Sequence, residues 1–388
     1  MRQLKFNVKS LPSDSILHHW HHYLSMTEVP VGFQIATGLS LIGALLQRNV
    51  YFDQLAWKVW PNISLLLVGP SGVGKDTAIN FMTRAIAEIS TDYHDGRIIS
   101  GKTMEFISKR LMKLGDPAAA IIKAPEITAL MGGKDYQKSM VQELTDLLST
   151  NERMEVSTAG EARIILRPTV TLLGGSTEEW LHRAMPEGSQ EGGFFPRLII
   201  ISEAYTSKHV PCPKYDYTPR ERANYIESKE AFTSGVCGII NRWGSGCNEI
   251  APSAEALDLY RNWYVNRFKL FSPRTKEYAN RSRDQVLKIA YLCAISRFKE
   301  YISIEDMEFA INFMAYVGAK LDGVVAGKTN EDRVIDSIRS MLPCSMKYIL
   351  MNSQGFDKQT ITNCIALMRS NEMIEKNVNG DWQWKDGD

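Results

Sequence analysis

The chain has 388 residues, of which 44% are hydrophobic and 23% are charged. This composition is ordinary for a globular protein, and the length allows about two or three domains. The net charge of +1 excludes a general attraction to polyanions, so a nucleic acid would have to be held by local patches. The six cysteines form no Cys-x-x-Cys pair, which argues against a zinc site and for a reducing compartment. No apolar run of about 18 residues and no basic-then-apolar leader occurs, so we expect a cytoplasmic protein with no membrane partner.

Residues 1–48 predict an N-terminal helical region. Apolar side chains recur at helical spacing in its first part, Pro30 interrupts the pattern, and residues 33–46 form a second apolar helix. Within the first helix, His18 and His22 have the i, i+4 spacing of a metal pair. Because no third ligand is near them in the sequence, we expect a solvated helix face and assign no metal there.

The strongest motif of the chain follows a short apolar run at residues 63–68. The run predicts a buried strand, a glycine-rich turn comes next, and the amphipathic residues after it predict a helix. The N–H groups of such a turn and the N-terminus of the helix can bind a phosphate, and Lys75 is expected to reach the β and γ phosphates. The predicted nucleotide-binding residues of this motif are Gly69, Pro70, Ser71, Gly72, Val73, Gly74, Lys75, Asp76 and Thr77.

One position departs from the pattern G-x-x-x-x-G-K-[ST]. Asp76 stands where a hydroxyl usually ligates Mg²⁺, and the hydroxyl comes one place later at Thr77. Three interpretations stay open: Thr77 ligates the metal instead, Asp76 acts on the metal directly or through water, or hydrolysis is impaired. ATP and Mg²⁺ are the expected cofactors in all three. The tetrad Gly-Lys-Asp-Thr is also similar to that of some nucleotide kinases.

A second buried strand is predicted at residues 118–122, a run without polar interruption that is typical of a central parallel strand. We expect this strand to lie beside the strand of the phosphate loop. Glu126 follows its carboxyl end, where a carboxylate can orient the attacking water, although Pro125 replaces the acidic residue that usually precedes it. The alternative is that Glu126 only stabilises the N-terminus of the next helix through the helix dipole.

Two basic segments come next. Residues 132–138 predict a loop with lysines and an aromatic residue, and residues 153–167 predict a β-hairpin. Lys134, Lys138 and Arg163 are therefore candidates for gripping a nucleic-acid backbone. Neighbouring glutamates dilute the positive charge, so ordinary solvated side chains are the open alternative.

A third strand, at residues 170–175, ends in hydroxyl groups. Ser176 or Thr177 is expected to sense the γ phosphate, or else to cap the helix that follows. Arg197 lies between a glycine turn and a last core strand at residues 198–201. It is expected to reach a γ phosphate, in trans if the protein forms rings, and the alternative is an arginine at the solvent edge of a strand.

These elements predict an α/β fold with a parallel sheet in a P-loop core at residues 49–207. Beyond a proline-containing linker, the pattern is helical through residues 208–326, which we interpret as a lid. Residues 327–388 predict three helices and a hairpin, with Asn379-Gly380 favouring a type I′ turn.

The C-terminal segment resembles a winged helix-turn-helix. That resemblance places Lys358 at the start of a recognition helix, where it would contact DNA. From Asn330 onward, 7 Lys plus Arg stand against 9 Asp plus Glu, a net charge of −2. Such a charge is poor for phosphate affinity, so protein docking is as well supported as DNA binding.

Several motifs together resemble phage and prophage ATPases described as primase-helicase or replicative-helicase-like proteins. They are Val29-Pro30, Gly38-Leu39-Ser40, the phosphate loop, Gly174-Gly175-Ser176-Thr177 and Gly192-Gly193-Phe194. The helix from Arg283 through Ala294, followed by Asp306, is similar to the lid of MCM-type AAA+ helicases. The resemblance implies an AAA+-like fold with the following roles: phosphate binding by Lys75, water activation by Glu126, the first sensor at Ser176 or Thr177, the finger at Arg197, and the second sensor at Arg283 in preference to Arg281.

The resemblance implies an ATP-dependent DNA motor of a phage or mobile element. Such a protein is expected to form a ring, with a hexamer as the expected size, and to act on single- or double-stranded DNA as a replicative helicase or a helicase loader. Another replication protein is a further expected partner. Two alternatives stay open: an ATP-switched adaptor that recruits a partner with little turnover, and a nucleoside monophosphate kinase.

Overall fold

The structure is a computed structural model of the whole chain. It divides into a large unit, Leu4–Val325, and a small unit made mainly of Ala326–Asp388, and each is described by itself. The residues that the structure describes are 6–100, 103–131, 137–149, 151–158, 161–184, 193–271, 275–325, 334–335, 337–338, 341–353, 356–370, 374–377 and 380–384.

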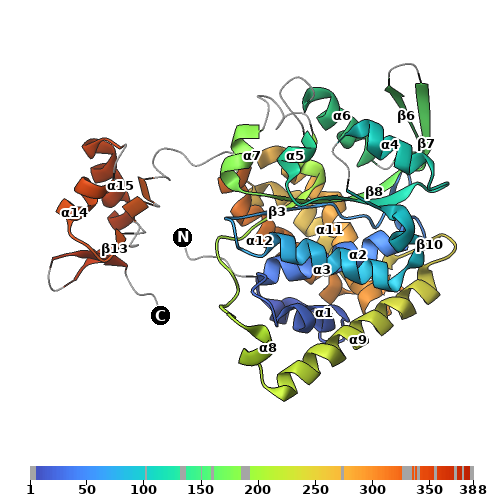
Figure 1. Ribbon diagram of the computed structural model, residues 1–388, viewed down its shortest axis with the longest axis horizontal. Helices are drawn as coiled ribbons and strands as arrows, with labels where there is room; N and C mark the ends of the chain where they lie inside the picture. Colours follow the sequence, from blue (N-terminus) through green and yellow to red (C-terminus); the bar gives the residue numbers. More distant parts are fainter. Residues whose placement is uncertain are drawn as a thin grey trace. The chain divides into compact units, whose positions relative to one another are not determined.

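A five-stranded, all-parallel sheet forms the centre of the large unit (Figure 1). Its strands, in spatial order, are β4 (Ile98–Ile99), β5 (Ala119–Ala124), β8 (Thr169–Ser176), β3 (Leu65–Val68) and β9 (Ile199–Ser202). Almost every residue of these strands is buried, as expected for a parallel sheet covered on both faces. The predicted α/β class with a parallel sheet is therefore confirmed.

The order of the strands corrects one prediction. β8 lies between β3 and β5 and pairs with both, so the strand that precedes Glu126 is not the neighbour of the phosphate-loop strand. Both candidate neighbours are uninterrupted apolar runs that alternate with helices, and a local pattern of that kind does not encode the order in which parallel strands pair. The consequence is that β8, which ends at Ser176, lies between the strand of the phosphate loop and the strand that precedes Glu126.

Two hydrophobic cores cover the two faces of the sheet. Leu65 and Leu67 of β3 face the first core, whereas Leu66 and Val68 face the second, because successive side chains of a strand point to opposite faces. Helices α1 (Leu17–Leu24), α2 (Val31–Leu46) and α3 (Lys75–Ile89) contribute to the first core. Helices α4 (Met104–Met112), α5 (Ile127–Met131), α6 (Gln137–Leu147) and α7 (Glu178–Ala184) lie on the other side, as Figure 1 shows.

The helices of the predicted lid also pack into the first core. They are α9 (Pro219–Trp243), α10 (Ala254–Asn266), α11 (Lys276–Ser296) and α12 (Ile304–Val325), with a short α8 (Pro213–Asp216) before them. The helix α9 begins with a complete capping box between Thr218 and Glu221, which fixes its first turn. The helix α11 is buried along most of its length and packs against α12.

Three smaller strand groups of the large unit lie outside the main sheet, one of them the parallel pair β11 (Ala251–Pro252) and β12 (Tyr301–Ile302). The strands β6 (Arg153–Thr158) and β7 (Glu161–Leu166) form the predicted antiparallel hairpin, and β7 contacts α4. The strand β1 (Val50–Asp53) pairs with β2 (Lys58–Val59) and with β10 (Asn248–Glu249). The turn between β1 and β2 forms one wall of a pocket.

The small unit has its own apolar core. Its described elements are the helices α14 (Met346–Asn352) and α15 (Lys358–Ser370) and the antiparallel strands β13 (Ile374–Lys376) and β14 (Trp382–Trp384). Val334, Ile338 and Trp382 are buried among them. The hairpin prediction is met in part, since Gly380 has φ of +80° but Asn379 lies outside the described residues. Throughout the described residues, no helix combines the length and apolar character that crossing a membrane requires.

Candidate functional site

The carboxyl ends of β3, β5, β8 and β9 meet at one edge of the sheet, as they must when all strands are parallel. The phosphate-loop motif leaves this edge at Gly69 and enters α3 at Lys75. The backbone N–H of Gly69 donates to Ser176 O at 3.2 Å, and that of Glu203 donates to Val68 O at 2.9 Å. Crevices beyond the carboxyl ends of parallel strands are where open α/β sheets bind ligands, so this edge is the first candidate site.

Glycines are required in this turn by conformation and by space. Gly72 and Gly74 have φ of +83° and +93°, a region that residues with a Cβ rarely adopt. A Cβ on Gly69 would lie 2.3 Å from Glu203 O, and one on Gly74 would lie 3.2 Å from Val29 Cα. The turn is therefore packed between the end of β9 and the segment before α2.

Lys75 fastens the start of α3 to the turn. Its ammonium donates to the carbonyl oxygens of Gly69 at 2.7 Å and Pro70 at 2.8 Å. Partial burial lowers the pKa of Lys75, and the nearby carboxylates of Asp76 and Glu126 act in the opposite direction. The lysine thus sits beside the turn, within electrostatic reach of the acid that follows β5.

Glu126 is held at the same edge by two hydroxyl groups. Its Oε1 accepts a hydrogen bond from Thr128 Oγ1 at 2.9 Å and another from Ser176 Oγ at 3.4 Å. The hydroxyl of Thr177 instead accepts the backbone N–H of Trp180 at 3.2 Å, which is the geometry of a cap for α7. The structure therefore brings Lys75, Glu126 and Ser176 together and gives Thr177 a capping contact.

Asp76 and Thr77 occupy the first turn of α3. Asp76 is exposed and lies within electrostatic reach of both Lys75 and Lys123, the latter on β5. Neither side chain makes a hydrogen bond to another residue in the part of the chain that is described. Among those residues, no three His, Cys, Asp or Glu side chains gather closely enough to hold a metal by themselves. A carboxylate and a hydroxyl are nevertheless donors of the kind that Mg²⁺ shares with phosphate oxygens and water.

A partly buried polar cluster under the phosphate loop was not predicted from the sequence. The carboxylate of Glu203, directly after β9, accepts a hydrogen bond from Tyr316 and pairs with Lys320 at 2.8 Å. Burial and the Glu203 charge raise the pKa of Tyr316, so the phenol stays protonated and donates. Since Tyr316 and Lys320 are on α12, more than 110 residues away in the sequence, no local spacing could have revealed this link between α12 and the phosphate loop.

Arg197 lies at the opposite edge of the sheet. It ends a short 3-10 helix, Phe195–Arg197, just before β9 begins, where Ile199 N–H donates to Ser64 O. The four residues of β3 separate this edge from the phosphate loop, a distance of about 13 Å at roughly 3.3 Å per residue. Arg197 therefore cannot reach a nucleotide that the same chain holds at the phosphate loop.

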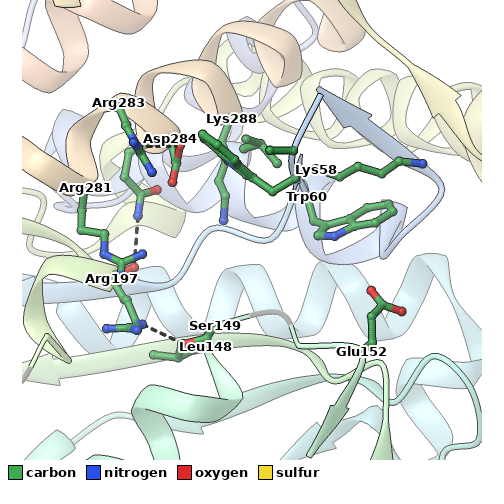
Figure 2. Close-up of a pocket in the computed structure, with 14 residues that line it drawn as sticks. Lys58, Trp60, Leu148, Ser149, Glu152, Arg197, Arg281, Arg283, Asp284 and Lys288 are labelled. Carbon is green, nitrogen blue, oxygen red and sulfur yellow. Dashed lines mark hydrogen bonds and ion pairs between the residues drawn. The ribbon is translucent and has the colours of Figure 1, made fainter. Parts of the chain in front are cut away.

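A pocket of about 560 Å³ opens beside Arg197 (Figure 2). One wall is the β1–β2 turn with Trp57, Lys58 and Trp60, and another is the first half of α11. The residues that α11 contributes are Arg281, Arg283, Asp284, Gln285 and Lys288. Ser149 and Glu152, which follow α6, line the side opposite α11. The pocket thus joins Arg197 to both arginines that the resemblance nominated for the second sensor.

Positive charge dominates this arginine pocket. Arg197 donates from Nε to Ser149 Oγ at 3.0 Å and from Nη1 to Gly193 O at 2.5 Å, and it has no carboxylate partner within the described residues. Burial, followed by the charge of Arg281, lowers the pKa of Arg197 to about 10. Burial also lowers the pKa of Lys288 to about 8. The carboxylates of Asp146 and Asp284 offset part of this charge, and the cations held close together still favour the binding of an anion.

The four predicted nucleic-acid contacts have different outcomes. Lys134 and the side chain of Lys138 fall outside the described residues. Arg163 is only 5% exposed; it donates to Ser108 Oγ at 3.1 Å and lies 3.7 Å from a carboxylate oxygen of Glu105. It therefore ties β7 to α4, and in this conformation it does not present its charge to a nucleic acid. Lys358 is exposed at the first position of α15.

No protein-family model matches this chain, and no curated protein sequence is significantly similar to it. What the fold defines is an α/β protein with a five-stranded parallel sheet and a glycine-rich turn between β3 and α3. Two sites of different chemistry lie at the two opposite edges of that sheet.

Proposed function

We propose that the chain is an AAA+-like P-loop ATPase that assembles into a ring, with ATP bound between adjacent copies. The observation that carries the proposal is the separation of two complementary half-sites. One edge of the sheet has the phosphate loop, Lys75 and Glu126, and the other has a cluster of cations around Arg197. Two copies that meet edge to edge would bring an anion-binding turn and an arginine cluster to one nucleotide.

The roles on the phosphate-loop side follow from the contacts there. The backbone N–H groups of the turn and the first turn of α3 would bind the phosphates, with Lys75 exchanging its carbonyl partners for phosphate oxygens. Glu126 would orient the attacking water, and Ser176, which donates to Glu126, would hold that carboxylate and sense the γ phosphate.

Asp76 and Thr77 are the residues that would hold Mg²⁺ together with phosphate oxygens. The charge of Asp76 acts on both Lys75 and Lys123, which supports a place for its carboxylate beside the bound phosphates. When bound, the cation supplies positive charge to the phosphate oxygens. The chain's own part is to keep these oxygen donors, an exposed Asp76 and a partly exposed Thr77, in the first turn of α3.

On the opposite side, Arg197 would act on the nucleotide of an adjacent copy. A guanidinium supplied in trans to the γ phosphate accelerates hydrolysis by roughly 10³- to 10⁵-fold in proteins that use one. The four residues of β3, about 13 Å at roughly 3.3 Å per residue, separate Arg197 from its own phosphate loop, which supports its use by an adjacent copy.

We extend the proposal to a DNA motor of the replicative-helicase or loader type, with a hexameric ring and single- or double-stranded DNA as partner. Support comes from the resemblance of the motifs to phage and prophage ATPases and of α11 to MCM-type lids. The exposed Lys358 at the start of α15 supports a DNA contact by the small unit. The charge of this segment equally supports docking to another replication protein.

The decisive experiment measures ATP turnover per chain as a function of protein concentration, with and without DNA. If each ATP site is shared between adjacent copies, turnover per chain rises as the copies assemble. Lys75→Ala and Arg197→Ala should each abolish turnover, but only Lys75→Ala should remove ATP binding. A monomer whose turnover does not depend on its concentration would refute the proposal, and transfer of phosphate to a nucleoside monophosphate would identify a kinase.

A second candidate function is the ATP-switched adaptor. Asp76 in place of the usual hydroxyl is the feature that favours it, because an altered metal site lets nucleotide binding persist while hydrolysis is slow. This alternative predicts assembly driven by ATP with negligible turnover, and the same measurements distinguish it from a motor.

A further inference from the structure

We propose that Arg281, together with Arg197, contacts the phosphates of the nucleotide held by an adjacent copy, and that Arg283 is a positioning residue that holds the Trp57 wall of the pocket. The inference rests on the proposed function and reverses the preference for Arg283 that the resemblance suggested. It concerns which of two arginines, two residues apart on α11, faces the ligand.

Arg283 is already engaged within its own chain. Its Nε lies 3.3 Å from an oxygen of Asp284, and its guanidinium lies over the indole of Trp57, 5.0 Å from the ring centroid. The two atoms are buried and make no hydrogen bond within the described residues, so this contact is an ion pair by distance, and the stack on Trp57 is the second contact of the guanidinium. To reach a phosphate, Arg283 would have to give up both contacts, whereas in place it supports the β1–β2 turn against α11.

Arg281 has the opposite surroundings. It is exposed, and within the described residues it has neither an ion pair nor a hydrogen bond. Residues two apart on a helix do not face the same direction. Figure 2 shows Arg281 directed toward Arg197, while Arg283 lies higher on the helix beside Asp284. The available guanidinium is therefore the one nearest Arg197.

The two arginines also form an electrostatic pair that a ligand would complete. The charge of Arg281 acts on Arg197 and on Lys288, and in both cases it works against the positive charge already there. Asp284 is the acid that α11 places among them, and it is paired with Arg283. A phosphate group placed between Arg197 and Arg281 would relieve their repulsion and accept hydrogen bonds from both.

The test compares Arg281→Gln with Arg283→Gln, a matched pair on one helix, in the full chain with ATP and Mg²⁺. Arg281→Gln is expected to lower kcat by roughly 10²- to 10³-fold with little change in the KM for ATP, because the lost contact strengthens in the transition state. Arg281→Lys should restore part of that loss. Arg283→Gln should lower kcat less than about tenfold, by loosening the pocket wall.

A double-mutant cycle checks the positioning role. The effects of Arg283→Gln and Trp57→Ala on kcat should be non-additive, since both remove the same stack, while Arg281→Gln and Trp57→Ala should add. Additive effects of Arg283→Gln and Trp57→Ala would overturn the positioning role. So would a loss of kcat on Arg283→Gln that equals or exceeds the loss on Arg281→Gln.

Mixed assemblies separate failure of this inference from failure of the proposed function. Arg281→Gln keeps an intact phosphate loop and Lys75→Ala keeps intact arginines, so mixing the two inactive variants should restore turnover at the interfaces that combine them. Rescue of Arg283→Gln but not of Arg281→Gln by Lys75→Ala would refute the assignment of the arginines. Full turnover by Lys75→Ala alone would refute the ATPase proposal itself.

Discussion

Gly175, next to the last residue of β8, gives the most direct test of how the phosphate-loop edge is built. An added Cβ would lie 2.4 Å from the carbonyl oxygen of Pro125 and 3.3 Å from its carbonyl carbon. These are backbone atoms at the end of β5, so no side-chain rotation relieves the overlap. Gly175→Ala therefore has to push the ends of β8 and β5 apart by about 1 Å to reach ordinary contact distances.

The expected destabilisation is about 1–3 kcal/mol, the usual range for overpacking. The large unit has about 320 residues, and an unfolding entropy of roughly 2.1 cal/mol/K per residue converts each kcal/mol into a Tm shift of about 1.5 °C. Gly175→Ala should thus lower Tm by about 1.5–4.5 °C. The same displacement would lengthen the 3.4 Å bond from Ser176 to Glu126, so turnover should also fall, by about 10²-fold for a 1 Å misplacement.

The assay is thermal unfolding followed by circular dichroism, paired with ATP turnover at a temperature well below the transition. Gly323→Ala is the matched control, because an added Cβ on this exposed residue of α12 meets no atom within 4 Å. Alanine there should stabilise the helix by about 0.5–1 kcal/mol and leave turnover unaffected. An unaltered Tm in Gly175→Ala would refute the packing argument, whereas a lowered Tm with full turnover would refute only the role given to Ser176 and Glu126.

Two further predictions concern buried charges. Lys320→Ala leaves the carboxylate of Glu203 with one partner fewer and should lower the free energy of unfolding in urea by about 2–3 kcal/mol. This is somewhat less than for a fully buried pair, because both side chains keep some exposure. A decrease below measurement error would contradict the prediction. Burial lowers the pKa of Lys288 from 10.5 to about 8, although the charge of Asp284 acts in the opposite direction. Between these two pH values, Lys288 therefore holds fewer protons in the folded state than in the unfolded state. The stability of the wild type relative to Lys288→Met should therefore rise by about 2–3 kcal/mol from pH 7.5 to pH 10.5, and a difference that is constant with pH would be the opposing result.

The sequence was sufficient where local chemistry fixes the structure. The glycines and Lys75 predicted a turn between a buried strand and a helix, and the left-handed φ of Gly72 and Gly74 agrees with that prediction. Apolar runs predicted the parallel strands, since only strands covered on both faces lack polar interruption. The class of fold followed from these two signals.

What the sequence could not supply was the arrangement of elements that are distant along the chain. The insertion of β8 between β3 and β5 depends on how the crossovers pack, and no residue of β8 signals it. The contact of Glu203 with Tyr316 and Lys320 likewise depends on the path of α12 across the end of β9. The sequence predicts that Arg163 is a cation available to a nucleic acid, yet the packing of β7 against α4 buries its side chain.

The sequence alone also does not show which sites the arginines of α11 can reach, because this depends on the edge of the sheet at which each group lies. A parallel sheet has two edges, and a group that precedes a strand lies at one while a group that follows it lies at the other. Arg197 precedes β9 and the phosphate loop follows β3, so the pairing of these adjacent strands keeps the two groups apart in every copy. A site that needs both is complete only where two copies meet, and the arginine pocket that joins Arg197 to Arg281 is already assembled on the edge that a second copy would have to approach.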